Sequence, residues 1–228
     1  MNAKADGRGR ILGAIRSALG ARGDEPGRRG QVRARLERSP NGLIPCRART
    51  TKPELIERFV TMLRAQGAAV RQVAKLADLP KAVAEQLAEF NLPAKLRHGN
   101  DPLIAGLDWS GTMIERELGP ARADDAVSLS RAVAGAAESG TLVLTSGPEN
   151  PSTLNFLPET HCIVLRADDL VGSYEDAWDA LRKAYGRGVL PRTVNFISGP
   201  SATADIEQTL IRGAHGPRRL AVFLIAGE

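Results

Sequence analysis

The feature that most limits the fold of this chain is a set of four short apolar runs, each bounded by residues that favour turns. The runs span residues 141–145, 162–165, 194–197 and 220–225. They are continuous rather than alternating in polarity, which is typical of strands buried on both faces of a largely parallel sheet. Such strands require helices to cover the sheet. We therefore expect a three-layer α/β domain with a mostly parallel sheet and no internal repeat.

Helical patterns occur where covering helices are needed. The segment from Pro53 to Gly67 has one apolar face, carries proline in its first turn and ends on glycine. Further helices are expected at 79–90 and 174–185, and a further strand is expected at 68–73. This alternation of helix and strand places the start of the domain near residue 51.

Composition limits the class of protein. Of the 228 residues, 43% are hydrophobic and 25% are charged, which is close to the average of folded globular proteins. The longest unbroken apolar stretch, residues 220–226, is far shorter than the roughly 20 residues of a membrane-spanning helix. The N-terminus is basic and polar, unlike a secretory signal. These properties predict a folded cytoplasmic protein without a membrane span.

The cysteines and histidines are few and far apart. Two cysteines, Cys46 and Cys162, provide neither a disulfide framework nor the four thiolates of an iron–sulfur cluster. The three histidines also lack the spacing of a metal motif. We expect no metal or cofactor in this chain, and we expect any redox centre to belong to a partner.

The positive charge is concentrated at the N-terminus. Residues 1–60 contain 14 Lys or Arg and 6 Asp or Glu, a net charge of +8, whereas residues 61–228 contain 17 and 20, a net charge of −3. No aromatic residue lies among the eight arginines from Arg22 to Arg49, and no nucleic-acid-binding motif accompanies them. A solvated or partner-facing arm therefore explains the charge better than nucleic-acid binding does.

Residues 1–50 are expected to form an extension of the α/β domain at 51–228. Apolar residues recur with helical spacing at Ile11, Leu12, Ile15 and Leu19. They describe one face of a short helix that ends near Gly20. Glycine, proline and arginine are frequent over residues 20–52, which favours a tether over packed structure. The helix packs either on its own domain or on another subunit.

Common catalytic and nucleotide-binding motifs are missing. The glycines at 7, 9 and 13 follow no strand and have the wrong spacing for a dinucleotide fingerprint. Neither a Walker A loop nor a GxSxG serine motif is present. Three segments with polar residues beside expected strands are the candidates for a functional site.

The first candidate segment begins at Glu138 and includes one of the apolar runs. A carboxylate at the mouth of a buried strand is costly to desolvate unless it is bonded, and Gly140 would let the backbone approach a ligand. Thr141 opens the strand, and Ser146 and Gly147 close it with small donors typical of anion-binding turns. Glu138 either acts on a ligand or caps nearby backbone N–H groups.

The second segment follows the run at 194–197. Its candidate residues are Ser198, Gly199, Ser201, Thr203, Asp205 and Glu207. Backbone N–H groups and hydroxyls in such a turn could bind phosphate or carboxylate, and the hydroxyls could equally cap a following helix.

The third segment, residues 213–217, holds His215 between glycines and proline before the last strand. Histidine exchanges protons near neutral pH, although a lone loop histidine is often only a hydrogen-bonded turn residue. The adjacent Gly216 is a candidate for ligand binding.

We expect the three segments to converge on one pocket, because a parallel sheet gathers the carboxyl ends of its strands along one edge. Glu138, Ser198, Ser201, Asp205 and His215 are then near neighbours. In this hypothesis Glu138, Asp205 and His215 are catalytic and the other candidates bind the ligand.

The three segments, in this order and spacing, resemble the LUD domain of the lactate-utilization protein C (LutC/YkgG) family. The matching stretches are residues 134–147, 197–207 and 213–217, and Pro45 followed by Arg47 matches as well. Ser139 stands where the family usually has Thr, and Ala202 stands where a basic residue is common.

The resemblance implies a fold similar to the sugar-phosphate isomerase and CoA-transferase group (NagB/RpiA/CoA transferase-like). It also implies a part in oxidising L-lactate to pyruvate, with iron–sulfur clusters in partner subunits. We therefore expect a subunit of a lactate-oxidising complex whose strand-end pocket binds a small anion. Two alternatives stay open: a stand-alone CoA-transferase-like enzyme with Glu138 as nucleophile or base, and a non-catalytic scaffold. Assembly into an oligomer also stays open.

Overall fold

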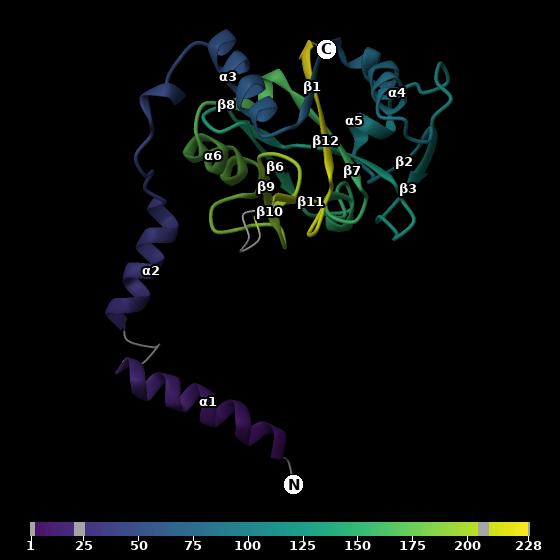
Figure 1. Cartoon of the computed structure of the whole chain (residues 1–228). Coiled ribbons are helices and arrows are strands. Elements are labelled where there is room, and N and C mark those ends of the chain that lie inside the picture. Colours follow the sequence, from purple (N-terminus) through teal and green to yellow (C-terminus); the bar gives the residue numbers. More distant parts are fainter. Residues whose placement is uncertain (1–2, 21–25, 205–209, 228) are drawn as a thin grey trace. The chain divides into compact units, whose positions relative to one another are not determined.

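The computed structural model describes residues 3–20, 26–204 and 210–227. The chain divides into two compact units, one within residues 1–42 and the other within residues 43–228. The eight residues before position 51 thus group with the α/β domain. Figure 1 shows the elements of both units.

The first unit contains two helices, α1 (Ala3–Leu19) and α2 (Pro26–Arg38). The apolar stripe of α1 is exposed, with Leu19 at 70%. Part of the segment expected to be a tether is helical, since α2 lies within it, and none of the described side chains of α2 is buried. Arginine, leucine, glutamine and glutamate are good helix formers, and proline is tolerated at the first helical position. The glycines and the proline of this segment indicate turns, so the sequence pattern did not predict a helix.

The second unit is built on a central sheet that has six parallel strands among the described residues, in the order β1-β12-β7-β4-β2-β3. The strands are β1 (Ala69–Lys75), β2 (Lys95–His98), β3 (Glu115–Leu118), β4 (Val127–Arg131), β7 (Thr160–Arg166) and β12 (Arg219–Gly227). In Figure 1, β12 is the yellow strand, and it lies between β1 and β7. The mixed α/β class with a mostly parallel central sheet is confirmed.

A second sheet has the order β8-β5-β6-β9. Its strands are β5 (Ala134–Ala136), β6 (Thr141–Thr145), β8 (Leu170–Val171) and β9 (Val194–Ile197). The strands β6 and β9 have the expected bounds, but their assignment to the parallel sheet is wrong, because β6 pairs antiparallel with both β5 and β9. Both faces of β6 are covered, so its apolar run resembles that of a parallel strand. A hairpin of β10 (Ala202–Ala204) and β11 (Leu210–Arg212) follows β9.

Helices cover the sheets as the apolar patterns require. The larger helices are α3 (Lys52–Ala65), α4 (Leu79–Glu89) and α6 (Tyr174–Tyr185). Short helical segments are α5 (Pro102–Ala105), η1 (Cys46–Ala48), η2 (Leu76–Asp78), η3 (Ser152–Asn155) and η4 (Ala167–Asp169). A capping box at Thr51 and Glu54 begins α3, and Gly67 in the left-handed region follows its end.

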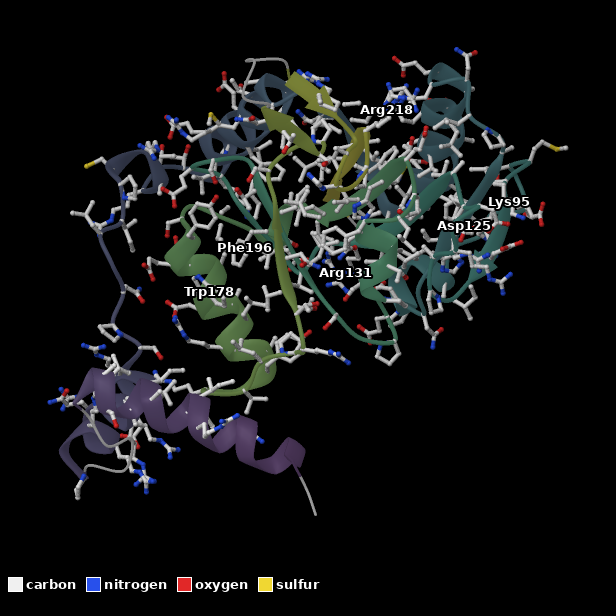
Figure 2. The ribbon with its side chains drawn as sticks, turned by 60° about the horizontal axis from the view of Figure 1, so that its bottom comes forward. Lys95, Asp125, Arg131, Trp178, Phe196 and Arg218 are labelled. Carbon is white, nitrogen blue, oxygen red and sulfur yellow. The ribbon has the colours of Figure 1, made fainter. Side chains whose placement is uncertain are left out.

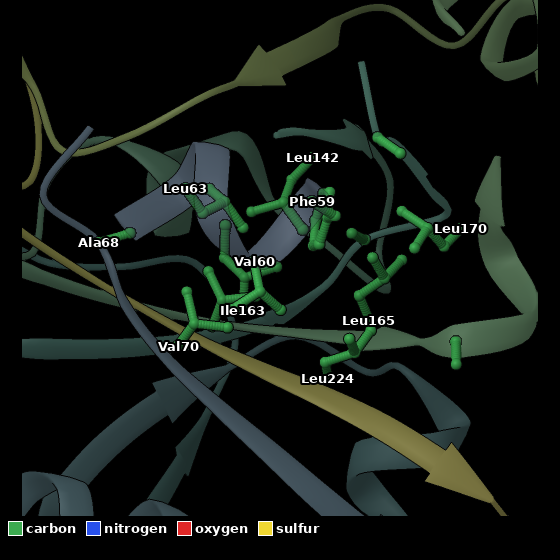
Figure 3. Packing of buried hydrophobic residues seen from close by; sticks show 14 of the residues in the cluster. Phe59, Val60, Leu63, Ala68, Val70, Leu142, Ile163, Leu165, Leu170 and Leu224 are labelled. Carbon is green, nitrogen blue, oxygen red and sulfur yellow. The ribbon is translucent and has the colours of Figure 1, made fainter. Parts of the chain in front are cut away.

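Successive residues of β12 point into two cores. Leu220, Val222 and Leu224 join α3 and β6 in one cluster, whereas Ala221, Phe223 and Ile225 join α4 in another. Figure 3 shows Phe59 and Leu63 of α3 packed beside Leu142 of β6. A third cluster packs α6 on the second sheet. The layers are therefore α4, the central sheet, α3 with the second sheet, and α6.

No helix in the described part of the chain is long and apolar enough to cross a membrane.

Candidate functional site

A cavity of about 200 Å³ lies where the chain leaves β9 and where it enters β12. Five residues proposed from the sequence line it: Ser198, Gly199, Ser201, His215 and Gly216. They come from two connections, residues 198–201 and residues 213–217. The second and third candidate segments therefore meet, as expected.

The two connections are held together by backbone hydrogen bonds at Ser201. The Ser201 N–H donates to the carbonyl of Pro217 over 2.8 Å, and the Gly213 N–H donates to the carbonyl of Ser201 over 3.0 Å. Gly216 packs against Ser201, since a Cβ built there would lie 3.5 Å from the Ser201 Cβ. The loop backbone at the rim of the cavity is thus tied to the start of β12.

The cavity lies at the amino ends of the central strands rather than at their carboxyl ends. Its wall includes His161 and Leu220, the second residues of β7 and β12, which are paired neighbours in the sheet. The expected reason for convergence is therefore wrong. The segments meet because the connection after β9 leads through the β10–β11 hairpin to the start of β12 (Figure 1).

Two buried residues of the cavity were missed as ligand-binding candidates. Asn155 and His161 are each only 1% exposed. The Asn155 amide nitrogen and oxygen and the His161 Nε2 have no hydrogen-bond partner. Burial lowers the pKa of His161 to about 3, so its imidazole is neutral near pH 7. Neither has a distinctive signal in the sequence: His161 stands directly before the apolar run at 162–165, and Asn155 lies seven positions before that run.

A cluster of hydroxyls joins the first candidate segment to the cavity. The Thr141 Oγ1 lies 2.7 Å from each of three hydroxyl oxygens, those of Ser139, Tyr174 and Ser198. A hydroxyl has one donor and two acceptor sites, so Thr141 is fully satisfied. The antiparallel register pairs Leu142 with Ile197, which brings Thr141 beside Ser198. Ser198 belongs to both the cluster and the cavity wall.

The Glu138 carboxylate is 8% exposed and is bonded at both oxygens. Its Oε1 accepts a 2.8 Å hydrogen bond from the backbone N–H of Tyr174, the first residue of α6. Its Oε2 lies 3.8 Å from the Arg47 Nη2. A negative charge at a helix N-terminus is favourable, which matches the capping interpretation. Glu138 is connected to the cavity through the hydroxyl cluster and is not among the described residues that line it.

Two glycines accommodate α3 at close range. Gly140 has φ +67°, and a Cβ there would lie 2.8 Å from the backbone nitrogen of Leu63. A Cβ at Gly199 would lie 2.8 Å from the Cβ of Gln66, directly after α3. Helix packing thus accounts for both glycines.

The remaining candidates lie elsewhere. Ser146 and Gly147 follow the opposite end of β6 from Thr141, and the Ser146 Oγ accepts a 2.9 Å hydrogen bond from the Thr193 N–H. Thr203 lies in β10. Asp205 and Glu207 lie outside the described residues.

Aromatic side chains pack beside this region. Phe196 of β9 lies 5.2 Å from Trp178 of α6 and 5.8 Å from Tyr174, measured between ring centroids. Figure 2 shows Phe196 and Trp178 next to each other. Phe196 also lines the cavity. The aromatic contacts therefore hold β9, the strand that directly precedes Ser198.

Over residues 3–20, 26–204 and 210–227, no group of three or more His, Cys, Asp or Glu side chains is placed to hold a metal ion.

Comparison with known proteins gives the family. The family model described as the LUD domain matches residues 56–225. The chain belongs to the LUD-domain family. The cavity of this LUD-domain protein lies within the matched region, which includes every described residue that lines it.

Several relatives of this LUD-domain protein are named lactate utilization protein C. The one from Geobacillus thermodenitrificans is 33% identical over 165 residues, 70% of this chain and 68% of that protein. The one from Deinococcus radiodurans is 32% identical over 190 residues, 79% of this chain and 84% of that protein. An uncharacterized protein of Neisseria meningitidis is 34% identical over 150 residues, 63% of this chain and 64% of that protein. The aligned regions thus span between 64% and 84% of these relatives.

A crystal structure of a DUF162 family protein from Deinococcus radiodurans has a similar fold. The TM-score is 0.56 and the sequence identity is 23%, over 77% of this chain and 99% of that chain. This likeness supports the fold described above.

Proposed function

We propose that this LUD-domain protein is a cytoplasmic subunit of an L-lactate-oxidising complex and that its cavity binds a small anion. The observation that carries the proposal is the alignment with proteins named lactate utilization protein C, which extends over 79% of this chain in one case. The cavity supports it, because residues of the two connecting loops, among them Ser198 and Ser201, line a space of about 200 Å³.

The chemistry of the proposed reaction requires an electron acceptor. L-lactate becomes pyruvate when it loses two electrons and two protons, one proton from the carbon and one from the hydroxyl. We assign the electrons to iron–sulfur clusters of partner subunits, because the two cysteines of this chain fall short of the four thiolates of a cluster. In this division of labour, this chain binds and positions the small anion.

The role is tested by growth and by purification. A deletion strain without another lactate-oxidising route is expected to lose growth on L-lactate and to regain it with the full chain. Affinity purification from lactate-grown cells is expected to recover iron-containing partners, whereas the chain purified alone contains no iron. Unchanged growth of the deletion strain would refute the lactate role, and stoichiometric iron in the isolated chain would refute the division of labour.

A further inference from the structure

A cleft of about 490 Å³ lies between one face of α3 and the chain segment that precedes this helix. The residues of the preceding segment are in η1 or follow it: Cys46, Arg47, Arg49 and Thr50. The residues of α3 recur at helical spacing and so share one face: Glu54, Glu57, Arg58, Thr61 and Met62. The cleft has no described residue in common with the cavity of the candidate site. It is therefore a separate place at which a ligand can bind.

Three arginines stand around the cleft, and the protein uses their charges little. The Arg47 side chain is 56% exposed, and its Nη2 lies 3.8 Å from the Glu138 Oε2, which is longer than a hydrogen bond. Neither Arg49 nor Arg58 has an ion-pair partner within 4.0 Å among the described residues. A guanidinium presents its N–H donors in a planar fork that matches the oxygens of an anion. The cleft thus holds donors that an anionic ligand can use.

Two glutamates also line the cleft. Glu54 accepts hydrogen bonds from the hydroxyl of Thr50 and from the N–H and hydroxyl of Thr51. The bonds from Thr51, together with the charge of Arg58, lower the pKa of Glu54. These bonds hold the Glu54 carboxylate at the first turn of α3. Glu57 is exposed, so water and salt screen its charge. Three arginines against two glutamates give the lining a net charge of +1, which favours an anionic ligand.

The arrangement fits a phosphate group better than a single carboxylate. A phosphate group carries more charge and has more acceptor oxygens, so several guanidiniums can bind it at once. The Thr61 side chain adds a hydroxyl to the lining. The volume of the cleft lies in the range of small-molecule sites, about 300–1,000 Å³. A small phosphate ester or a diphosphate therefore suits the cleft in both charge and size.

We propose that the cleft between η1 and α3 binds a small molecule that bears a phosphate group, held by Arg47, Arg49 and Arg58. This site is additional to the cavity. The inference goes beyond the proposed function and does not rest on it, so either can fail without the other.

Cys46 makes a local test possible. Its thiol is exposed and lines the cleft, whereas Cys162 is buried, and burial raises the pKa of Cys162 to about 12. The chain has no other cysteine. Alkylation of the native full chain by iodoacetamide near pH 8 therefore takes place at Cys46, and its rate reports whether the cleft is occupied.

The probes in this test are inorganic phosphate, pyrophosphate, glycerol 3-phosphate and L-lactate, with NaCl at matched ionic strength. At saturation, pyrophosphate or glycerol 3-phosphate is expected to slow the alkylation of Cys46 by at least about fivefold, because the ligand blocks access to the thiol. L-lactate and NaCl are expected to leave the rate nearly unchanged. Absence of protection by every phosphate compound would overturn the proposal, and so would equal protection by L-lactate or by NaCl alone.

Calorimetry of full-length variants tests the arginines. Arg49→Gln and Arg58→Gln each remove a charge and keep a polar side chain, and each is expected to weaken pyrophosphate binding by at least about fivefold. Arg192→Gln is the matched control, because Arg192 is exposed and does not line the cleft. This control is expected to bind as the parent does.

Two results would contradict the assignment of the arginines. Parent-like binding by both Arg49→Gln and Arg58→Gln would show that these side chains do not hold the ligand. Binding that leaves the alkylation of Cys46 unchanged would place the anion outside the cleft, as when it binds the arginines of residues 1–42. If Arg58→Gln does not fold, the exposed position of Arg49 keeps the test decisive.

Discussion

The imidazole of His161 is almost fully buried at the start of β7, which disfavours its protonated, charged form. Burial lowers its pKa to about 3 from the usual 6.5. Between these values the unfolded chain takes up a proton that the folded chain does not bind. Folding is therefore opposed more strongly as the pH falls.

This difference predicts an acid-labile fold. The contribution of His161 to stability is fully present above pH 6.5 and is lost as the pH falls toward 3. The slope is about 1.4 kcal/mol per pH unit, so about 2 kcal/mol is lost between pH 6.5 and pH 5. Urea unfolding of the parent and of His161→Gln at both pH values measures it. Burial also lowers the pKa of His98, so the relevant quantity is the difference between parent and variant. The prediction would be contradicted if the free energy of unfolding changed equally with pH in the parent and in His161→Gln.

A second prediction concerns the stability of variants at Glu138. Glu138→Ala removes the acceptor of the Tyr174 N–H and the charge near the start of α6. We expect a loss of about 1–3 kcal/mol in the free energy of unfolding. Glu138→Gln retains an acceptor oxygen and is expected to lose less. Chemical denaturation measures both, and growth complementation shows whether function falls in step with stability. Loss of growth by Glu138→Gln at parental stability would instead support a catalytic carboxylate.

The helix α3 covers β1 and β7, packs on β6 and meets the turn before β6 (Figure 3). That turn contains Gly140, where both the positive φ and the contact with Leu63 exclude a side chain. The close approach sets the position of β6 and hence of Thr141 in the hydroxyl cluster. The packing of α3 is therefore coupled to the wall of the cavity through Ser198.

Gly140→Ala is expected to destabilise the domain by at least about 2 kcal/mol, because it adds backbone strain to a steric clash with helix backbone. Gly147→Ala is the matched control in the turn at the other end of β6. A Cβ there meets nothing within 4 Å, so the variant is expected to unfold within about 0.5 kcal/mol of the parent. The urea concentrations at which the two variants are half unfolded compare their stabilities directly. Similar stabilities would show that α3 can retreat from the turn.

The elements themselves were largely predictable from local pattern. The bounds of β6, β9 and α6 match the expected ones residue for residue, because burial imposes continuous or helical apolar periodicity on the sequence. Sheet membership was not predictable, since a strand covered on both faces has the same pattern in either kind of sheet. Asn155 was not predictable either, because an unpaired amide is defined by atoms distant in the chain.

At the scale of the whole molecule, the two units differ in how they are stabilised. The three hydrophobic clusters draw their residues from position 55 onward, while α1 and α2 present exposed side chains in the first unit. The short segment before α3 belongs with the larger unit. Ala48 is buried there, and a Cβ at Gly172 would lie 2.0 Å from its carbonyl oxygen.

Two truncations test this division. A chain of residues 43–228 is expected to unfold cooperatively within about 1 kcal/mol of the full chain, whereas residues 51–228 are expected to lose about 2 kcal/mol because the Ala48 packing and the Arg47–Glu138 ion pair are removed. Thermal and urea unfolding compare the three chains. A large loss on removing residues 1–42 would place the first unit within the folding core.

The same truncations test partner binding by the basic arm. Removing residues 1–42 takes away most of the arginines between positions 22 and 49. Association with partners is expected to weaken, and in the full chain it is expected to weaken as salt is raised. Pull-down of the partners at low and high salt measures this. Salt-independent association that survives truncation would assign docking to the larger unit.

The position of β12 has a consequence for biosynthesis. This strand is the last of the described strands to leave the ribosome, yet it fills the place between β1 and β7. Until it arrives, the nascent chain exposes the edges of β1 and β7 with which β12 pairs, and such edges invite pairing with other chains. A ribosome stalled before residue 219 would therefore carry a domain in which no strand lies between β1 and β7.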